Sequence, residues 1–524
     1  MQNAKINISF PDGKVREFEK NVSGNDIAKS ISSGLAREAL AVEVDGEVWD
    51  SSRPIAQDAK VKILKWDDAG GKYAYWHSSA HVMAEAIETI FPGTKFGIGP
   101  PIDMGFYYDI DMGDHTLSPD DLLKIEEKMY EFTKRDVPFT REEKKWEDAV
   151  AYFKKKGDQY KLELLDGLKG QTITFYQQGN FTDLCYGPHI PSTGRIKAIK
   201  LLSVAGAYWR GSEKNKMLQR IYGVTFPSKK ELDDYLFRLE EAKRRDHRKL
   251  GKELELFMFH DVAPGAPFWM PKGMIIFREL EKFIREELDK RNYQEINTPI
   301  LVKKDLWEQS GHWEHYKENM FMFEQDETVF SLKPMNCPES TYVYRCKVRS
   351  YKDLPLRFSE IGRLHRNELS GALGGMFRVR QITMDDAHIY IRPDQILTEI
   401  TDLIKLVNHV YSLFGLKVSF NLSTMPDNAM GDPKLWERAE DSLKKALELN
   451  NFSYILKPKD GAFYGPKIDI QMKDARGKED TAFTVQYDFV MPKRFKLVYT
   501  DQNGKEKETL VVHRSSIGDR KSVV

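Results

Sequence analysis

Two pairs of residues with metal-binding or hydrolytic side chains recur at a spacing of four in the first half of the chain. His77 and His81 lie in WHSSAHVMAEAI, which reads as a helix, so both imidazoles share one helical face. Cys185 and His189 lie in DLCYGPHIP, where proline and glycine predict a loop. The residues alone leave three interpretations open: two unrelated pairs, a zinc site, or a metal-free hydrolytic pocket.

A second constellation lies in LRFSEIGRLHRNELSGALGGMFRVRQITMDDAHIYI, which predicts a strand, a glycine-rich loop and a second strand. Alternation places Leu364, Arg366 and Glu368 on one face of the first strand. Arginine forks fit phosphate oxygens, an apolar step fits a purine ring, and an acid with an imidazole fits an amine and a metal ion. An edge strand with its charges facing water is the structural alternative. One face of the second strand presents guanidinium groups, then apolar side chains, then an acid and an imidazole: Arg378, Arg380, Ile382, Met384, Asp386 and His388.

A metal ion at His388 needs further ligands, and the sequence offers one cysteine and one histidine. Cys337 lies in PMNCPES, where Pro338 predicts the start of a helix, and a helix N-terminus favours a thiolate. His513 lies in LVVHR, the last predicted strand. The wide spacing makes this trio a weak pattern by itself. It would leave the fourth tetrahedral position open, as in zinc sites that bind substrate.

The amino-terminal half that must position the first set of residues reads as two segments. Residues 1–64 predict two strand pairs, one turned at Asp45-Gly46, around a helix at 23–35, and this order predicts a β-grasp fold. Residues 65–226 predict an α+β unit, with a helix that begins after Ser118.

The carboxyl-terminal half also reads as two segments. Residues 227–249 predict a single linker helix that ends in a basic cluster, for which a solvated helix face is the favoured interpretation. Residues 250–524 predict helices with mostly antiparallel strands. The fold class is therefore multidomain α+β, without the glycine-rich loops of the common nucleotide-binding folds.

The bulk composition excludes several classes of protein. The 524 residues are 41% hydrophobic, and 80 basic residues balance 80 acidic ones, which argues against an overall positive field but does not exclude nucleic acid, because local clusters matter more than totals. No apolar run approaches the roughly 20 residues that span a bilayer, and no signal-peptide pattern begins the chain. Three cysteines cannot form a disulfide framework. We therefore expect a cytoplasmic protein without membrane spans.

Together these segments resemble threonyl-tRNA synthetase of the bacterial type, a class II aminoacyl-tRNA synthetase. Residues 1–64 resemble its TGS domain, and HSSAH, DLCYGPH, GAYWRG and KMLQRIYG resemble its editing domain, residues 65–226. GAPFWMPKG through EINTPIL resembles the first class II motif, which is a dimer element, and RFSEIGRLHRNELSGAL through FRVR resembles the second. MNCPES, DDAHIY and VVHRSSIG resemble the three zinc-ligand segments. The resemblance covers almost the whole chain.

The resemblance implies a threonine–tRNA ligase. Such an enzyme uses ATP with Mg²⁺ to form threonyl-adenylate from L-threonine, transfers threonine to tRNA(Thr), and is a homodimer. It implies that ATP and catalysis involve Arg366, Glu368 and Arg378. It implies that the amino acid contacts Asp386, Tyr464 and Gln486. It implies one zinc ion per chain on Cys337, His388 and His513, which threonine chelates through its amino and hydroxyl groups.

The resemblance also implies a second, hydrolytic site. A site that demands a hydroxyl ligand rejects valine strongly, but serine has the hydroxyl, and a missing methyl is worth only about 1–3 kcal/mol. Editing of seryl-tRNA(Thr) would correct this error. The implied editing residues are His77, His81, Asp183, Cys185 and His189.

Two positions and the carboxyl-terminal end depart from the family pattern. Ile382 stands where the family places phenylalanine, and Met384 stands where it places glutamine. After HRSSIG the chain reads DRKSVV, without the third class II motif or the anticodon-binding domain, and Arg520 does not fall at the spacing of the motif arginine. We therefore expect weak threonine activation from this chain. One rival interpretation is a hydrolase that only edits, and the intact ATP and zinc residues argue against it. The other is a non-catalytic RNA-binding relative, which only the missing carboxyl-terminal segment supports.

Overall fold

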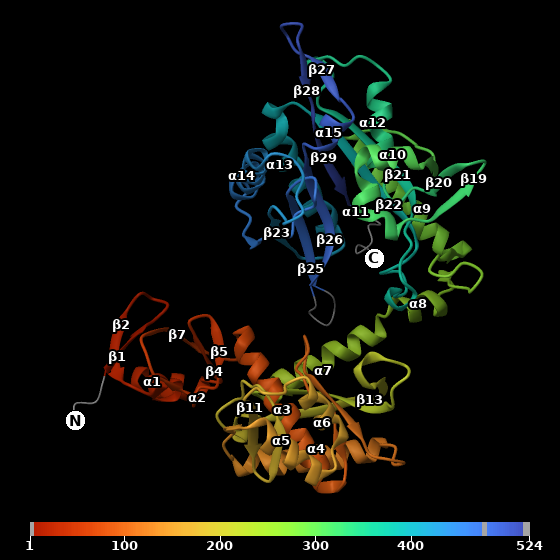
Figure 1. Cartoon of the computed structure of the whole chain (residues 1–524). Coiled ribbons are helices and arrows are strands. Elements are labelled where there is room, and N and C mark those ends of the chain that lie inside the picture. The colour runs from red at the N-terminus through yellow and green to blue at the C-terminus, as the bar shows by residue number, and fades with distance from the viewer. Residues whose placement is uncertain (1–4, 474–478, 517–524) are drawn as a thin grey trace. The chain divides into compact units, whose positions relative to one another are not determined.

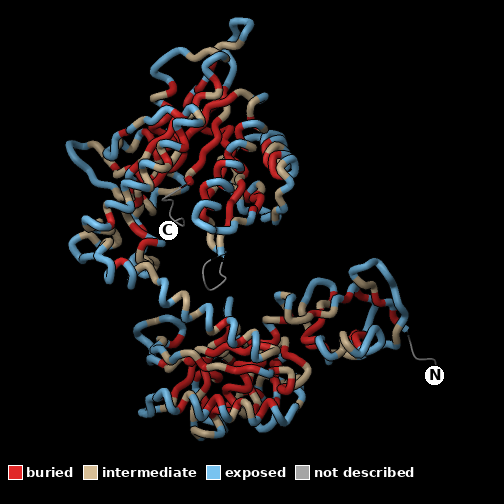
Figure 2. Tube along the Cα trace, turned by 180° about the vertical axis from the view of Figure 1, so that it is seen from behind, coloured by how far each residue is buried: buried red, intermediate tan, exposed pale blue. Residues whose placement is uncertain are grey.

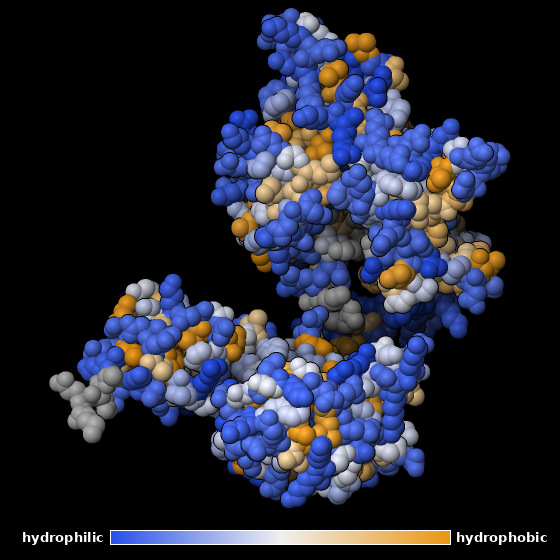
Figure 3. Space-filling model, viewed as in Figure 1, coloured by the Kyte–Doolittle hydropathy of each residue, from blue (hydrophilic) through white to orange (hydrophobic). Residues whose placement is uncertain are grey.

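The computed structural model describes residues 5–473 and 479–516, and the chain divides into two compact units, Met1–Phe237 and Arg238–Val524 (Figure 1). The last segment of the chain, DRKSVV with Arg520, lies outside the described residues. None of the described helices is both long enough and apolar enough to cross a membrane. The face drawn in Figure 3 is mostly hydrophilic, with isolated hydrophobic patches.

The first unit begins with the predicted β-grasp fold. Its five-stranded sheet packs on one helix, and Ile8 and Val42 of the sheet and Ile27 of the helix are fully buried between them. The single helix expected at 23–35 is instead two, α1 (Gly24–Ile31) and α2 (Ser33–Glu38), because Ser32 ends the first and caps the second. In sheet order the strands are β2 (Val15–Glu19), β1 (Lys5–Ser9), β7 (Ala59–Leu64), β4 (Ala41–Val44) and β5 (Glu47–Trp49), beside a small pair, β3 (Val22–Ser23) and β6 (Pro54–Ile55).

The rest of the first unit surrounds one long helix, α3 (Ala69–Ile90). This helix is buried on nearly every side, because small and apolar residues occupy almost all of its middle turns. It packs against α4 (Pro119–Arg135), which begins after Ser118 as predicted, and Ser118 and Asp121 form a capping box there. Two further helices are α5 (Trp146–Lys156) and α6 (Gln159–Asp166).

Two sheets complete this part of the unit. The four-stranded sheet runs β13 (Ala198–Tyr208), β14 (Met217–Phe226), β9 (Phe106–Asp111) and β8 (Lys95–Phe96). The three-stranded sheet runs β10 (Thr140–Lys144), β11 (Ile173–Gln178) and β12 (Phe181–Leu184). The loop that follows β12 carries Cys185 and His189 back towards α3.

The linker is not the single helix that the sequence predicted. Helix α7 (Lys229–Arg244) ends before the basic cluster does, and α8 (His247–Glu253) begins anew. The break occurs at Asp246, whose carboxylate accepts a hydrogen bond from the backbone N–H of Arg248 at 2.8 Å and so caps the second helix.

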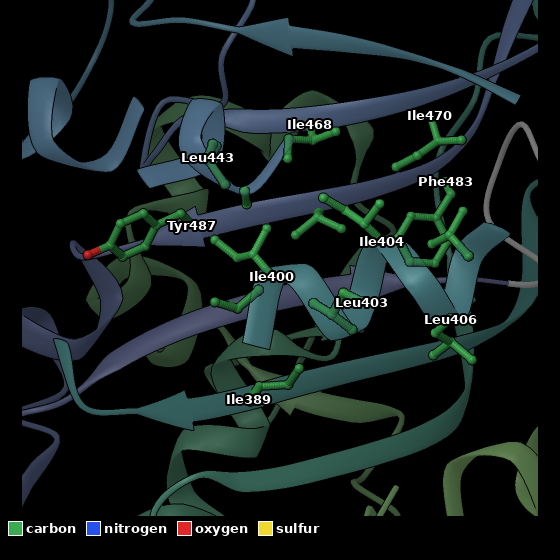
Figure 4. Close-up of a cluster of buried hydrophobic side chains, with 14 of the residues drawn as sticks. Ile389, Ile400, Leu403, Ile404, Leu406, Leu443, Ile468, Ile470, Phe483 and Tyr487 are labelled. Atoms are coloured by element: carbon green, nitrogen blue, oxygen red, sulfur yellow. The ribbon is translucent and has the colours of Figure 1, made fainter. Parts of the chain in front are cut away.

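The second unit is built on an eight-stranded, mainly antiparallel sheet, and buried residues concentrate along its strands (Figure 2). Helices α13 (Ile396–Leu413) and α14 (Pro433–Leu449) cover one face, together with the end of α9 (Pro271–Asp289). Figure 4 shows Ile400 and Ile404 of α13 packed on Ile389 and Phe483 of the sheet. In sheet order the strands are β17 (Gln294–Glu295), β21 (Leu356–His365), β22 (Gln381–Ile391), β29 (Leu510–Ser515), β26 (Glu479–Asp488), β25 (Lys467–Lys473), β23 (Val418–Ser423) and β24 (Tyr454–Lys457).

The opposite face of the sheet meets α12 (Cys337–Arg345). Strand alternation separates the two faces: Ala387, Ile389 and Ile391 belong to the helix-covered core, so Asp386 and His388 point the other way. The remaining elements are α10 (Lys304–Ser310), α11 (His312–Tyr316), α15 (Met491–Arg494), β15 (Phe257–Met258), β16 (Phe268–Trp269), β18 (Leu301–Lys303), β19 (Met322–Gln325), β20 (Thr328–Leu332), β27 (Val498–Thr500) and β28 (Glu506–Glu508).

Candidate functional site

Three neighbouring strands of the large sheet place three polar side chains in one row. His388 of β22 pairs with His513 of β29, and His513 pairs in turn with Gln486 of β26. Cys337 reaches the same place from the first residue of α12. The ligand atoms of Cys337, His388 and His513 lie within 4.8 Å of one another. The trio that the sequence suggested only weakly is therefore brought together by the fold.

All three residues of this trio, Cys337, His388 and His513, are buried. Burial raises the pKa of the Cys337 thiol and lowers the pKa of His388, where the neighbouring His513 adds to the effect. Nε2 of His513 lies 2.9 Å from Oδ2 of Asp488, which leaves the other ring nitrogen for a metal. Carboxylates commonly orient metal-binding histidines in this way, so the donor set and its support fit a zinc ion.

A cavity of about 270 Å³ opens beside the trio. Its lining includes four more residues that the sequence implicated: Arg366, Asp386, Tyr464 and Gln486. Asp386 accepts a hydrogen bond from Nδ2 of Asn336 at 2.9 Å, and burial raises the pKa of its carboxyl to about 6. Tyr464 donates its hydroxyl hydrogen to Oε1 of Gln486. The cavity thus offers an acid, an amide and a phenol beside a metal-binding trio.

The other two expected ATP residues do not line this cavity. Nε of Arg378 donates to Oε2 of Glu368 at 2.9 Å, and the Glu368 carboxylate is buried while Arg378 is half-exposed. Arg366 lines the cavity, and its Nε donates to the carbonyl of Pro334 at 3.2 Å. The two residues that depart from the family pattern, Ile382 and Met384, belong to one small apolar cluster, and Met384 also lines the cavity.

The first unit contains a second constellation, the His/Cys cluster of His77, His81, Cys185 and His189, whose ligand atoms also lie within 4.8 Å of one another. Sγ of Cys185 lies 3.2 Å from Nε2 of His77 and 3.2 Å from Nε2 of His189. The rings of His77 and His189 are stacked, with centroids 4.4 Å apart. Helix α3 and the loop after β12 therefore meet, and the interpretation as two unrelated pairs is wrong.

Burial sets the protonation of the His/Cys cluster. It lowers the pKa of His77 to about 3 and that of His81 to about 4, and it also lowers the pKa of His189 and raises that of Cys185. At neutral pH the cluster therefore presents neutral imidazoles and an uncharged thiol. Neutral imidazoles accept protons. The raised pKa keeps Cys185 protonated, and a thiol is a much poorer nucleophile than a thiolate.

Asp183 lies next to this cluster in a buried ion pair that the sequence did not reveal. Its carboxylate lies 2.8 Å from Nζ of Lys161, and the hydroxyl of Tyr108 also donates to it. Burial works to raise the pKa of Asp183, but the Lys161 ammonium outweighs it, so the pKa lies below its ordinary value. Lys161 escaped notice because it stands in an ordinary polar helix, and only its near-complete burial sets it apart.

One further residue near the trio was missed. His312 is buried, with Nε2 at 3.9 Å from Sγ of Cys337 and Nδ1 at 2.8 Å from Oγ of Ser310. It lies in GHWEHY, a histidine-rich run that could have drawn attention to it.

Three segments of the sequence match models of known protein families. Residues 6–65 match the TGS domain, residues 173–222 match the second additional domain of threonyl and alanyl tRNA synthetases, and residues 321–522 match the class II core domain of tRNA synthetases for G, H, P, S and T. The large antiparallel sheet with its cavity is thus a class II aminoacyl-tRNA synthetase core, a type of domain that uses ATP with Mg²⁺.

Individual relatives narrow this class. The threonine–tRNA ligases of Desulforamulus reducens and Acetivibrio thermocellus are 51% and 50% identical to the chain over 514 residues, which is 98% of the chain and 81% of each relative. The RNA-binding domain of threonyl-tRNA synthetase from Cryptosporidium parvum superposes with a TM-score of 0.52 at 42% identity, over 53% of this chain and 70% of that one. The chain belongs to the threonyl-tRNA synthetase family. Its reaction is the ATP-dependent joining of threonine to tRNA, and it carries an editing domain.

Proposed function

We propose that Cys337, His388 and His513 hold one zinc ion and that the adjoining cavity is the threonine pocket. The row of His388, His513 and Gln486 across three strands carries this proposal, because strand register fixes it and Cys337 completes it. The zinc ion would act as a Lewis acid that binds the amino and hydroxyl groups of threonine. The other side chains position the amino acid: the Asp386 carboxylate accepts a hydrogen bond from an N–H of its neutral amino group, and Tyr464 and Gln486 close the pocket.

Arg366 and Arg378 contact the ATP phosphates in this proposal, and Glu368 contacts the adenine. Arg366 is already in the cavity, and Arg378 is half-exposed on the same hairpin, tied to Glu368. Planar guanidinium groups fit phosphate oxygens, and fixed cations stabilise charge that develops during phosphoryl transfer. Ile382 and Met384 supply an apolar wall beside these arginines.

The His/Cys cluster, with Asp183 beside it, hydrolyses seryl-tRNA(Thr) in this proposal and works without a metal ion. Hydrolysis needs a base for water, and the cluster supplies neutral imidazoles. The water oxygen bonds to the seryl carbonyl carbon, the ester bond to the ribose breaks, and the water proton ends on the released ribose oxygen. The crowded cluster has no room for the extra methyl group of threonine, so it accepts serine alone. The synthetic site cannot make this choice, because the smaller serine also fits a pocket built for threonine.

We propose domain bounds of 1–64, 65–226, 227–249 and 250–524 for the TGS domain, editing domain, linker and core. The partners are tRNA(Thr), ATP and L-threonine, and the protein works in the cytoplasm, where translation consumes charged tRNA.

A homodimer is the proposed assembly, because apolar side chains of the segment that resembles the first class II motif are exposed. Ile275 and Ile276 of α9 are 63% and 47% exposed, and Phe268 of β16, just before the helix, is also exposed. Sedimentation equilibrium should give about twice the chain mass of 60.8 kDa. Ile275→Asp together with Ile276→Asp should shift the protein to monomer, and a wild-type monomer would contradict the proposal.

Zinc content tests the metal proposal. The purified protein should contain one zinc ion per chain, and Cys337→Ser should lose it, because the thiolate is one of only three protein ligands. Cys346→Ser is the matched control, since Cys346 is an exposed free cysteine, and it should keep its zinc. The measurement is elemental analysis after dialysis. Full zinc in Cys337→Ser, or a second zinc that His77→Ala removes, would contradict the assignment.

Deacylation tests the editing proposal. The protein should hydrolyse seryl-tRNA(Thr) and spare threonyl-tRNA(Thr), and the double variant His77→Ala, Cys185→Ala should slow serine release by about 100-fold or more, the usual range for a lost general base. His115→Ala is the control, because this half-exposed histidine of the same domain lies outside the cluster. Unchanged serine release in the double variant would remove the assignment.

A further inference from the structure

A carboxylate of the β-grasp domain lies buried against the editing loop. Asp50 follows β5, and only 6% of the residue is exposed. Its Oδ1 accepts a hydrogen bond from the backbone N–H of His189 at 2.6 Å, and its Oδ2 accepts one from the hydroxyl of Tyr176 at 2.5 Å. Both donors belong to the editing domain, 139 and 126 residues further along the chain. One side chain of the first domain therefore bridges two parts of the next.

Burying the Asp50 carboxylate away from water costs free energy, and its two hydrogen bonds offset this cost. Burial raises the pKa of its carboxyl, and the bonds from Tyr176 and His189 oppose that effect, with weaker help from Arg141 and Arg53. No ion pair to Asp50 occurs among the described residues. A buried carboxylate without a salt bridge depends on its hydrogen-bond donors, and these donors are parts of the editing site.

The two bonds fix the part of the loop that orients His189. Its backbone N–H is held by Asp50, and its ring packs on Tyr176 with centroids 4.4 Å apart and on Phe139 at 5.0 Å. Nε2 of the same ring then faces Sγ of Cys185 at 3.2 Å. Asp50 thus acts on both the backbone of His189 and the aromatic surface that supports its ring.

Gly187 shows how tightly the loop sits on Tyr176. Its φ is +80°, and a Cβ there would lie 2.3 Å from the tyrosine hydroxyl oxygen. Any shift of Tyr176 is therefore transmitted to the backbone between Cys185 and His189. The Gly187 N–H in turn donates to Sγ of Cys185 at 3.3 Å.

We propose that Asp50 is a positioning residue of the editing site, through which the β-grasp domain holds the Cys185–His189 loop in its hydrolytic geometry. The inference rests on the editing function proposed above. Asp50 touches no reacting atom in this scheme. It acts through His189, and a displacement of about 1 Å in a catalytic group can cost about 100-fold in rate.

Three variants of the full chain test this role. Asp50→Ala removes both acceptors and should lower kcat for seryl-tRNA(Thr) hydrolysis at least tenfold with KM nearly unchanged, because the bound tRNA keeps its other contacts. Asp50→Asn keeps an acceptor for the His189 N–H and should restore most of that loss. Asp67→Ala is the matched control, an exposed aspartate in the same stretch of chain, and should match the parent. Threonine-dependent pyrophosphate exchange should be the same in all three variants.

Each alternative outcome has a distinct meaning. Parent-like hydrolysis by Asp50→Ala, while the parent edits, would overturn the positioning role and leave the editing proposal intact. An equal loss in Asp50→Ala and Asp50→Asn, with lower melting temperatures and slower pyrophosphate exchange, would show a merely structural residue and overturn it too. A parent that does not hydrolyse seryl-tRNA(Thr) at all would overturn the editing proposal and this inference with it.

Discussion

The register of three antiparallel strands, β22, β29 and β26, is the constraint on which the rest of the second unit depends. It sets His388, His513 and Gln486 side by side on one face of the sheet. On the other face, the same alternation buries Ala387 and Ile389 under α13 and α14. A slip of one residue would exchange the two faces, placing imidazoles in the core and isoleucines in the cavity. Core packing and site geometry are therefore specified together.

The two sites complement each other because threonine has two close analogues. A pocket that binds a hydroxyl group rejects valine, since a buried polar site left unmet is costly, but it has little with which to reject the smaller serine. In the proposed function the second site uses the opposite criterion, size, in a cluster where burial keeps the imidazoles neutral. Under this proposal each domain performs a discrimination that the other cannot.

Local sequence patterns predicted much of this. Helical spacing and turn residues gave the β-grasp fold, the cap of α4 and the mainly antiparallel core, and the motifs gave the family. The sequence could not show that the linker breaks at Asp246, because the helix-forming composition continues through it. Nor could it reveal Lys161 or His312, whose burial depends on contacts distant in sequence. The same holds for Asp50, whose two hydrogen-bond donors lie 139 and 126 residues further along the chain.

The proposed roles of the site residues differ in how directly the structure supports them. The metal-binding trio converges on one cavity with three more residues, Asp386, Tyr464 and Gln486, and this shared position supports their proposed roles. Glu368 and Arg378 are bonded to each other outside that lining, so their contacts with ATP rest on the family motif and on the shared hairpin.

Calorimetric titration of the zinc-loaded protein with threonine, and separately with valine, tests the central claim most directly. Both amino acids have nearly the same shape, so only a site that binds the hydroxyl group separates them. Threonine should bind, valine should bind at least about tenfold more weakly, and His513→Ala should abolish threonine binding. Equal affinities for the two amino acids, or unchanged threonine binding in His513→Ala, would contradict the assignment of the row across β22, β29 and β26 as the threonine site.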